Sequence, residues 1–379
     1  MKILHVIPTL SPASGGPAEA LRQLVRWYPK IGVEAEIVCL DEQGSDWITS
    51  FAAQVHALGE RGGTYGRSPQ LRNWLRRQVM RFDGVVAHAM WTYPALAAAH
   101  AARGHVPYAV FPHGMLDPWF RQRYPLKHLK KCLYWPIQYP VLRDAKSVLF
   151  TSKLESELAP KSFWPHKWNS LVVPYGTNEP PLDLEVQRQA FEKALPQLAG
   201  RPFLLFLSRI HEKKGCDLLV EAFASVARQR GDVDLVIAGP DKDGLQAKLA
   251  GWAEQLGVGK RIHWPGMLTG DAKWGALRAC EAMILPSHQE NFGVVVAEAL
   301  ACSRPVLISN QVNVWPQIEE DRTGLVEPDT LDGTRSLLTR WFGLSEEEKA
   351  EMAERALAAF KRRYSMRNCA LAIRDLFGS

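Results

Sequence analysis

The chain has 379 residues, which is more than one hydrophobic core usually holds, so two domains are expected. No apolar run approaches the roughly 20 residues that cross a bilayer, and the first run, 3–7, is too short for a signal peptide. The formal net charge of +6 is modest, and the six cysteines lack the spacing of a zinc or redox site. A cytoplasmic enzyme with reduced thiols is therefore expected.

Short apolar runs alternate with helical patterns along both halves of the chain. The runs are 3–7, 36–40, 84–87, 108–111 and 147–150, followed by 203–207, 235–238, 282–285 and 305–308. This alternation predicts an α/β protein with two Rossmann-like, doubly wound domains of parallel strands. In such folds ligands bind at the carboxyl ends of the strands, here in a central cleft that the two domains face.

A segment rich in proline and polar residues, 164–184, separates the two series of strands. We place the boundary near Tyr175 and Gly176, which gives domains at 1–175 and 176–360. The remaining segment, 361–379, contains a predicted helix.

A glycine-rich turn, 12–17, follows the first predicted strand and precedes a helical pattern. Gly15 and Gly16 let backbone amides approach a ligand closely, and Pro17 suits a first helical turn. A dinucleotide-binding dehydrogenase or epimerase is the alternative. The absence of Gly-x-Gly-x-x-Gly and of Tyr-x-x-x-Lys argues against that alternative.

The segment Pro118 to Arg143 is basic and aromatic and has no Asp or Glu. Lys127, Lys130 and Lys131 are predicted to share one helical face, and Leu126, Leu129 and Leu133 form an apolar stripe. An anionic membrane surface is one expected partner. The alternative is an ordinary helix whose stripe is buried on the first domain. Nucleic acid is not expected as a partner, because no recognised motif accompanies the basic residues.

Two carboxylates, Glu290 and Glu298, stand eight positions apart across the junction of a loop and a predicted helix. Backbone N–H groups at such a helix start suit a phosphate, and flanking carboxylates can accept hydrogen bonds from hydroxyls. Phosphate together with hydroxyls describes a nucleotide sugar. The alternative is that Glu290 caps the helix and Glu298 is a solvated helix residue.

Arg209 and Lys214 follow another predicted strand and could converge on one diphosphate, although a solvated basic loop is the alternative. Spacing favours Lys214 over Lys213. Cations and helix-end amides can stabilise a departing diphosphate without a metal. The Asp-x-Asp triplets at 232–234 and 241–243 are interpreted as strand-edge and loop carboxylates, so neither a metal nor another cofactor is expected.

Three segments together resemble the retaining glycosyltransferases of family 4, which have the GT-B fold. They are 290–301, beginning Glu-Asn-Phe-Gly; 206–215, in which Ser208 replaces the usual glycine; and Val173-Pro174-Tyr175-Gly176-Thr177, in which Tyr175 replaces asparagine. The resemblance implies a C-terminal helix that crosses back to the first domain.

The resemblance also implies roles for individual residues. Arg209 and Lys214 would hold the donor diphosphate, Glu290 the sugar hydroxyls and Glu298 the ribose. The remaining donor contacts would come from Gly15 and Gly16, from Gly266, Met267 and Leu268, and from Asn291, Phe292, Gly293 and Val294. His113 would contact the transferred sugar or its leaving group. Separately, Trp91, Tyr93, Trp119 and Arg121 are expected on the acceptor side, because sugar rings stack on aromatic faces; the alternative is that these aromatics belong to the core.

The expected function is metal-independent, retaining transfer of a hexose to a glycan or lipid-linked glycan in polysaccharide synthesis. UDP-glucose is the first donor choice and GDP-mannose the second, and no catalytic base is assigned. The protein would act in the cytoplasm or at the inner face of the membrane. A phosphorylase or sugar-nucleotide hydrolase of the same fold, or a non-catalytic, membrane-associated nucleotide-sugar binder, remains an alternative.

Overall fold

A computed structural model describes residues 1–49, 51–59, 62–198, 200–227 and 232–378. The chain forms two compact units, one of Met1–Asn178 with Ser365–Ser379 and one of Glu179–Tyr364. The division after Asn178 falls in the proline-rich segment that was predicted to separate the domains. The returning segment begins at Ser365 and not at 361, because helix α14 (Glu346–Arg363) continues to Arg363 and packs on α11 and α12 of the second unit.

The first unit is built on a seven-stranded sheet in the order β3-β2-β1-β4-β5-β6-β7, with every strand parallel to its neighbours. The strands are β1 (Lys2–Val6), β2 (Glu34–Cys39), β3 (Gln54–Ala57), β4 (Gly84–His88), β5 (Tyr108–Phe111), β6 (Ser147–Phe150) and β7 (Ser170–Val172). The two edge strands, β3 and β7, escaped prediction because both are largely half-buried or exposed and show no continuous apolar run.

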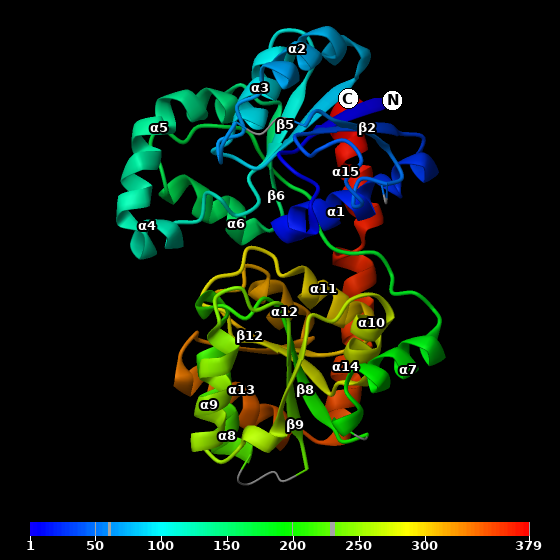
Figure 1. Ribbon diagram of the computed structural model, residues 1–379, viewed down its shortest axis with the longest axis vertical. Coiled ribbons are helices and arrows are strands. Elements are labelled where there is room, and N and C mark those ends of the chain that lie inside the picture. The colour runs from blue at the N-terminus through cyan, green and yellow to red at the C-terminus, as the bar shows by residue number, and fades with distance from the viewer. Residues whose placement is uncertain (50, 60–61, 199, 228–231, 379) are drawn as a thin grey trace. The chain divides into compact units, whose positions relative to one another are not determined.

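Helices cover both faces of this sheet (Figure 1). Helices α2 (Pro69–Gln78), α3 (Tyr93–Ala102) and α5 (Pro125–Arg143) share a core with alternate residues of β1, β4 and β5, such as Leu4, Val85 and Val110. On the opposite face α1 (Gly16–Val25) packs against α15 (Met366–Gly378), the C-terminal helix. The predicted return of the last helix to the first domain is therefore confirmed.

The second unit holds a six-stranded parallel sheet in the order β10-β9-β8-β11-β12-β13. Its strands are β8 (Phe203–Leu207), β9 (Asp234–Ala238), β10 (Ile262–Gly266), β11 (Ala282–Leu285), β12 (Val306–Ser309) and β13 (Gly324–Glu327). The surrounding helices are α7 (Leu184–Ala194), α8 (Cys216–Ala227), α9 (Leu245–Gln255), α10 (Gly270–Ala279), α11 (Val294–Ala301), α12 (Trp315–Asp321), α13 (Leu331–Gly343) and α14.

Strand order reverses between β1 and β4 in the first sheet and between β8 and β11 in the second. Ligands of doubly wound sheets bind beyond the carboxyl ends of the strands at such a reversal. The predicted fold class, two Rossmann-like α/β domains, is confirmed. A ligand site is therefore expected at the loops after β1, β4, β8 and β11.

Helix α5 lies beside the short helix α4 (Trp119–Arg123), as Figure 1 shows. It exposes an apolar stripe. Leu126, Leu129, Leu133 and Ile137 have relative exposures of 77, 60, 78 and 51 %. The alternative in which this stripe is buried on the first domain is wrong, because the helix turns Trp135 and other residues toward the core instead. No helix in the described part of the chain is long and apolar enough to span a membrane.

Candidate functional site

In the second unit, Lys214 and Glu290 meet at the reversal of strand order. Lys214 ends the turn after β8, and Glu290 lies in the loop after β11, the neighbouring strand. The ammonium of Lys214 donates to Oε2 of Glu290, and their side chains are only 7 and 20 % exposed. Burial alone would raise the pKa of Glu290, but the charge and hydrogen bond of Lys214 outweigh burial and hold that pKa below its usual range.

Close packing explains how two separate loops bring this pair together. Gly215, in the left-handed region at φ 66°, follows Lys214 directly, and a Cβ atom there would overlap the carbonyl oxygen of Pro286 in the loop after β11. Only glycine permits this approach. On the other side, the backbone of Glu290 is fixed by hydrogen bonds to Gln311 (2.9 Å) and Asn313 (3.0 Å).

The start of α11 offers backbone donors beside Glu290. Gly293 precedes the helix with φ 72°, and its Cα lies close to the Glu290 side chain, since an added Cβ would be 3.2 Å from Glu290 Cγ. Within the described structure no acceptor pairs with the N–H groups of Gly293 and Val294. The N–H of Asn291 differs, because it donates to Oε1 of Glu290 (3.1 Å) and so orients the carboxylate. Phe292 is 5 % exposed and packs edge-on against Tyr364.

Glu298 is not a solvated helix residue. It is 5 % exposed, and its Oε1 accepts a hydrogen bond of 2.7 Å from Lys273 on α10. Sequence reasoning missed Lys273, since its place beside Glu298 depends on how α10 packs against α11. Arg209, by contrast, is exposed and forms no hydrogen bond or ion pair within the described residues.

The residues predicted to contact the base of the donor, 266–268, lie at the end of β10, the strand next to β9. Gly266 ends β10 with φ 73°, and its carbonyl accepts from the N–H of Gly239 (2.8 Å). Met267 is 61 % exposed, whereas Leu268 is 7 % exposed. The three residues thus lie at the same end of the sheet as the Lys214 loop, two strands away from β8.

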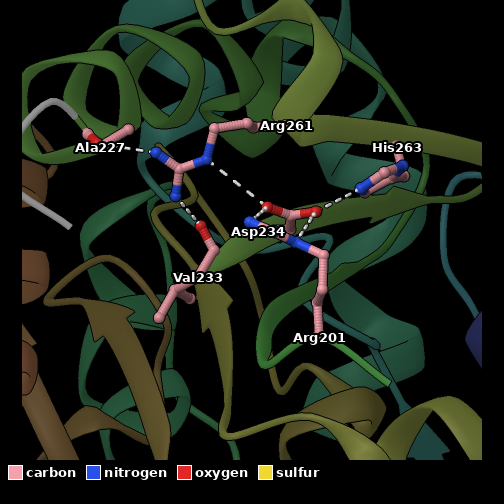
Figure 2. Close-up of polar contacts among 6 residues, drawn as sticks. All are labelled: Arg201, Ala227, Val233, Asp234, Arg261 and His263. Carbon is pink, nitrogen blue, oxygen red and sulfur yellow. Dashed lines mark hydrogen bonds and ion pairs between the residues drawn. The ribbon is translucent and has the colours of Figure 1, made fainter. Parts of the chain in front are cut away.

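In each Asp-x-Asp triplet one carboxylate has structural partners, and Figure 2 shows those of Asp234. Asp234, 3 % exposed, is contacted by Arg201 (2.9 Å), Arg261 (3.5 Å) and His263 (2.8 Å) at the start of β9, the end of the sheet opposite the site. Asp241 accepts two backbone N–H groups, of Leu245 and Gln246, at 3.0 Å, and so fixes the first turn of α9. Nowhere in the described ranges do three or more His, Cys, Asp or Glu gather to hold a metal ion.

In the first unit, half-buried His113 is one end of a hydrogen-bonded chain that sequence reasoning did not find; its other histidines, His5 and His88, are buried. His113 Nε2 lies 3.1 Å from His88 Nδ1, His88 Nε2 lies 2.9 Å from His5 Nδ1, and His5 Nε2 lies 3.0 Å from the Tyr28 hydroxyl. The three histidines come from β1, from β4 and from the loop after β5.

Burial keeps these histidines neutral. It lowers the pKa of His5 to about 3 and that of His113 to about 4, and it lowers the pKa of His88 well below its ordinary value, with a further contribution from the two neighbouring histidines. A neutral imidazole carries one N–H, so the tautomers are coupled along the chain. Whether His113 presents Nδ1 as a donor or as an acceptor therefore depends on His88 and His5.

The glycine turn also lies in the first unit, after β1. Gly15 precedes α1 with φ 88°, and Gly16 is the first residue of the helix; both are exposed. Helix α1 ends at Val25, and Tyr28 begins a short 3-10 turn that brings its hydroxyl to His5.

The predicted acceptor-side residues fall in two places. Trp91, with φ 64°, packs between Phe163 and Trp135 and donates through Nε1 to the carbonyl of Met115 (3.4 Å). Tyr93 opens α3. Trp119 and Arg121 lie on α4, where Trp119 packs edge-on against Tyr124 (5.9 Å) and Arg121 is exposed.

Two family models match most of the chain. Residues 15–176 match the glycosyl transferase 4-like domain, and residues 187–357 match the glycosyl transferases group 1 domain. The matches follow the two structural units in order along the chain.

Individual relatives agree with these domains. The chain is 26 % identical to α-D-kanosaminyltransferase of Streptomyces kanamyceticus over 61 % of this chain and 60 % of the relative. It is 30 % identical to the D-inositol 3-phosphate glycosyltransferase of Paenarthrobacter aurescens over 43 % of each. The match thus spans less than two thirds of these relatives. In fold the chain is similar to Anabaena HepE, with a TM-score of 0.76 at 18 % identity over 100 % of this chain and 99 % of HepE.

Three findings lead to one assignment. Both sheets are parallel and reverse their strand order, two loops bring a lysine to a glutamate at the reversal in the second sheet, and both domain models match. The chain belongs to the GT-B glycosyltransferases of family 4.

Proposed function

We propose that this protein transfers a hexose from a nucleoside diphosphate donor to a hydroxyl of a glycan or lipid-linked glycan, with retention and without a metal. The observation that carries the proposal is the buried Lys214–Glu290 pair beside the N–H groups of Gly293 and Val294. A cation and a helix start can bind phosphate, and an oriented carboxylate can bind sugar hydroxyls.

In this proposal the leaving diphosphate binds where the protein supplies positive charge. Arg209, which is exposed and has no protein partner among the described residues, and Lys214 would stabilise the charge that develops as the anomeric bond to phosphate breaks. Glu290 would hold the sugar, Glu298 with Lys273 the ribose, and the backbone at 266–268 the base. We assign no catalytic base, since attack on the same face as the departing phosphate lets that phosphate accept the acceptor's proton.

His113 would serve as a neutral hydrogen-bonding partner for the sugar and not as an acid, because burial lowers its pKa to about 4. UDP-glucose is the first donor to test. HepE, which shares this fold, has been crystallised with UDP-glucose.

The test is a panel of UDP, GDP, ADP and their hexose conjugates in the presence of a chelator, read by thermal shift and calorimetry. A ligand that binds only the folded protein must stabilise it. We expect one nucleotide to be preferred and its sugar to be passed to an acceptor with the anomeric configuration retained. Release of free sugar alone would identify a hydrolase, binding without turnover would identify a sensor, and loss of turnover on chelation would refute metal independence.

We further propose that the enzyme works at an anionic membrane surface through the exposed stripe of α5. Four apolar side chains face solvent there, with Lys130 next to them on the helix. Replacing Leu126, Leu129 and Leu133 by serine should abolish flotation with vesicles that contain phosphatidylserine, and Lys130→Glu should weaken it. Leu182→Ser, at an 89 % exposed leucine of the second unit, is the matched control and should change nothing.

A further inference from the structure

A pocket in the first unit lies between α4 and α5. Its volume is about 200 Å³, and its lining residues are Met115, Asp117, Phe120, Tyr124, Lys127, His128, Lys131 and Phe163. One of its lining residues, Met115, lies two residues after His113 in the same loop. The exposed leucines of α5 point away from it, since residues 126 and 131 are separated by about 140° around an α-helix.

The pocket contains a lysine without a carboxylate partner. Lys131 places its ammonium 4.9 Å from the ring centre of Trp91 and 5.4 Å from that of Phe120, and within the described chain it forms no ion pair. Segment 118–143 has no acidic residue. Asp117, which also lines the pocket, accepts a hydrogen bond of 2.9 Å from the backbone N–H of Trp119.

Positive charge is concentrated here at an energetic cost. Burial lowers the pKa of Lys131, and the nearby charge of Lys127 lowers it further. Lys127 itself lies 4.8 Å from the Tyr124 ring centre. Burial, together with the charges of Arg121 and Lys131, also lowers the pKa of His128. An anion bound between these groups would offset their mutual repulsion.

The walls fit a sugar ring. His128 stacks on Phe163 with ring centres 4.7 Å apart, and Phe120 and Tyr124 complete an aromatic lining. Aromatic faces provide the apolar contact that one side of a pyranose needs, and a few polar groups fix its orientation.

We infer that this pocket binds an anionic sugar, a hexose that carries a phosphate or a carboxylate, as part of the acceptor. The inference rests on the proposed transferase function and specifies its acceptor class. The anion would lie between Lys127 and Lys131, and the ring would contact Phe120, Tyr124 or Phe163.

The test uses the full-length protein labelled with 5-fluorotryptophan, with the Trp91 resonance assigned from a Trp91→Phe variant. Glucose 1-phosphate, glucuronate and glucose are titrated separately, so the arms distinguish phosphate from carboxylate as the anion. We expect the Trp91 resonance to move with at least one charged sugar and to respond at least tenfold more weakly to glucose.

Neighbouring lysines supply the matched variants. Lys131→Met should weaken the response at least tenfold, whereas Lys130→Met, on the solvent side of the helix, should leave it unchanged. Equal responses to glucose and both charged sugars, or an unchanged response in Lys131→Met, would overturn the inference. UDP binding, measured separately by calorimetry, reports on the donor site, so failure of the proposed function would be seen independently.

Discussion

At the scale of single residues, the strongest prediction concerns two adjacent lysines. Lys214 is buried against Glu290, whereas Lys213 is half-exposed and its carbonyl accepts from the backbone of His288. Lys214→Met should lower turnover about 100-fold, the effect typical of removing one preorganised electrostatic group. Lys213→Met should stay within about threefold of the wild-type protein. Steady-state kinetics and UDP calorimetry measure both, and equal losses in the two variants would contradict the assignment.

The buried histidine chain predicts acid sensitivity. His5, His88 and His113 have lowered pKa values in the folded state, so the unfolded chain binds more protons between pH 4 and pH 6.5 and stability must fall as pH decreases through that window. Between pH 7.5 and pH 5.5 each histidine lowers the free energy of unfolding by about 1.4 kcal/mol, and the three histidines together lower it by about 4 kcal/mol.

Urea unfolding at the two pH values measures this loss. Replacing His5 by asparagine should reduce the difference between the midpoints at pH 7.5 and pH 5.5. His166→Gln should not, because His166 is exposed; its Nδ1 pairs with the carbonyl of Phe163. An unchanged midpoint between the two pH values would show that the histidines are not buried neutral groups.

At the scale of elements, the start of β9 is fixed by charge. Burial would raise the pKa of Asp234, but hydrogen bonds from Arg201 and His263 outweigh it and lower that pKa, so the stabilisation is fully present above the ordinary pKa of aspartate (Figure 2). Arg261 also ties this corner to the carbonyls of Ala227 and Val233. Removing one partner of such a buried network should lower the free energy of unfolding by about 3 kcal/mol.

Asp234→Asn should therefore lower the free energy of unfolding at pH 7.5, measured with urea. Asp232→Asn changes the neighbouring carboxylate of the same triplet, which is exposed, and should cost less than about 0.5 kcal/mol. If the two variants lose equal stability, the triplet does not act through the Asp234 contacts.

Elements also show where sequence reasoning succeeds and stops. Lys214 and Glu290 could be paired in advance because each follows a buried strand, and parallel strands end at one edge of a sheet. Lys273 could not, since its contact with Glu298 depends on helix packing. The α5 stripe shows the same limit: periodicity identifies the apolar face of a helix but does not show whether other residues cover it.

At the scale of the whole molecule, the first sheet is completed by the last helix. Gly84 opens β4, and a methyl group added to it would lie 2.5 Å from the ring of Phe377 on α15. Residues near the two ends of the chain and the centre of one sheet therefore form a single core. Family resemblance could predict that the helix returns, but not which residue it meets, because this depends on the register of α15 on the sheet.

This contact can be tested as a double-mutant cycle. Gly84→Ala should destabilise the protein by about 2 kcal/mol through overpacking against the Phe377 ring. Phe377→Ala should cost about 3 kcal/mol because it leaves a cavity. In the combined variant the added methyl group enters that cavity, so the total loss should be at least 1 kcal/mol smaller than the sum, which is the coupling expected of residues in direct contact. Additive losses in urea unfolding would show that α15 does not pack on β4 in this register.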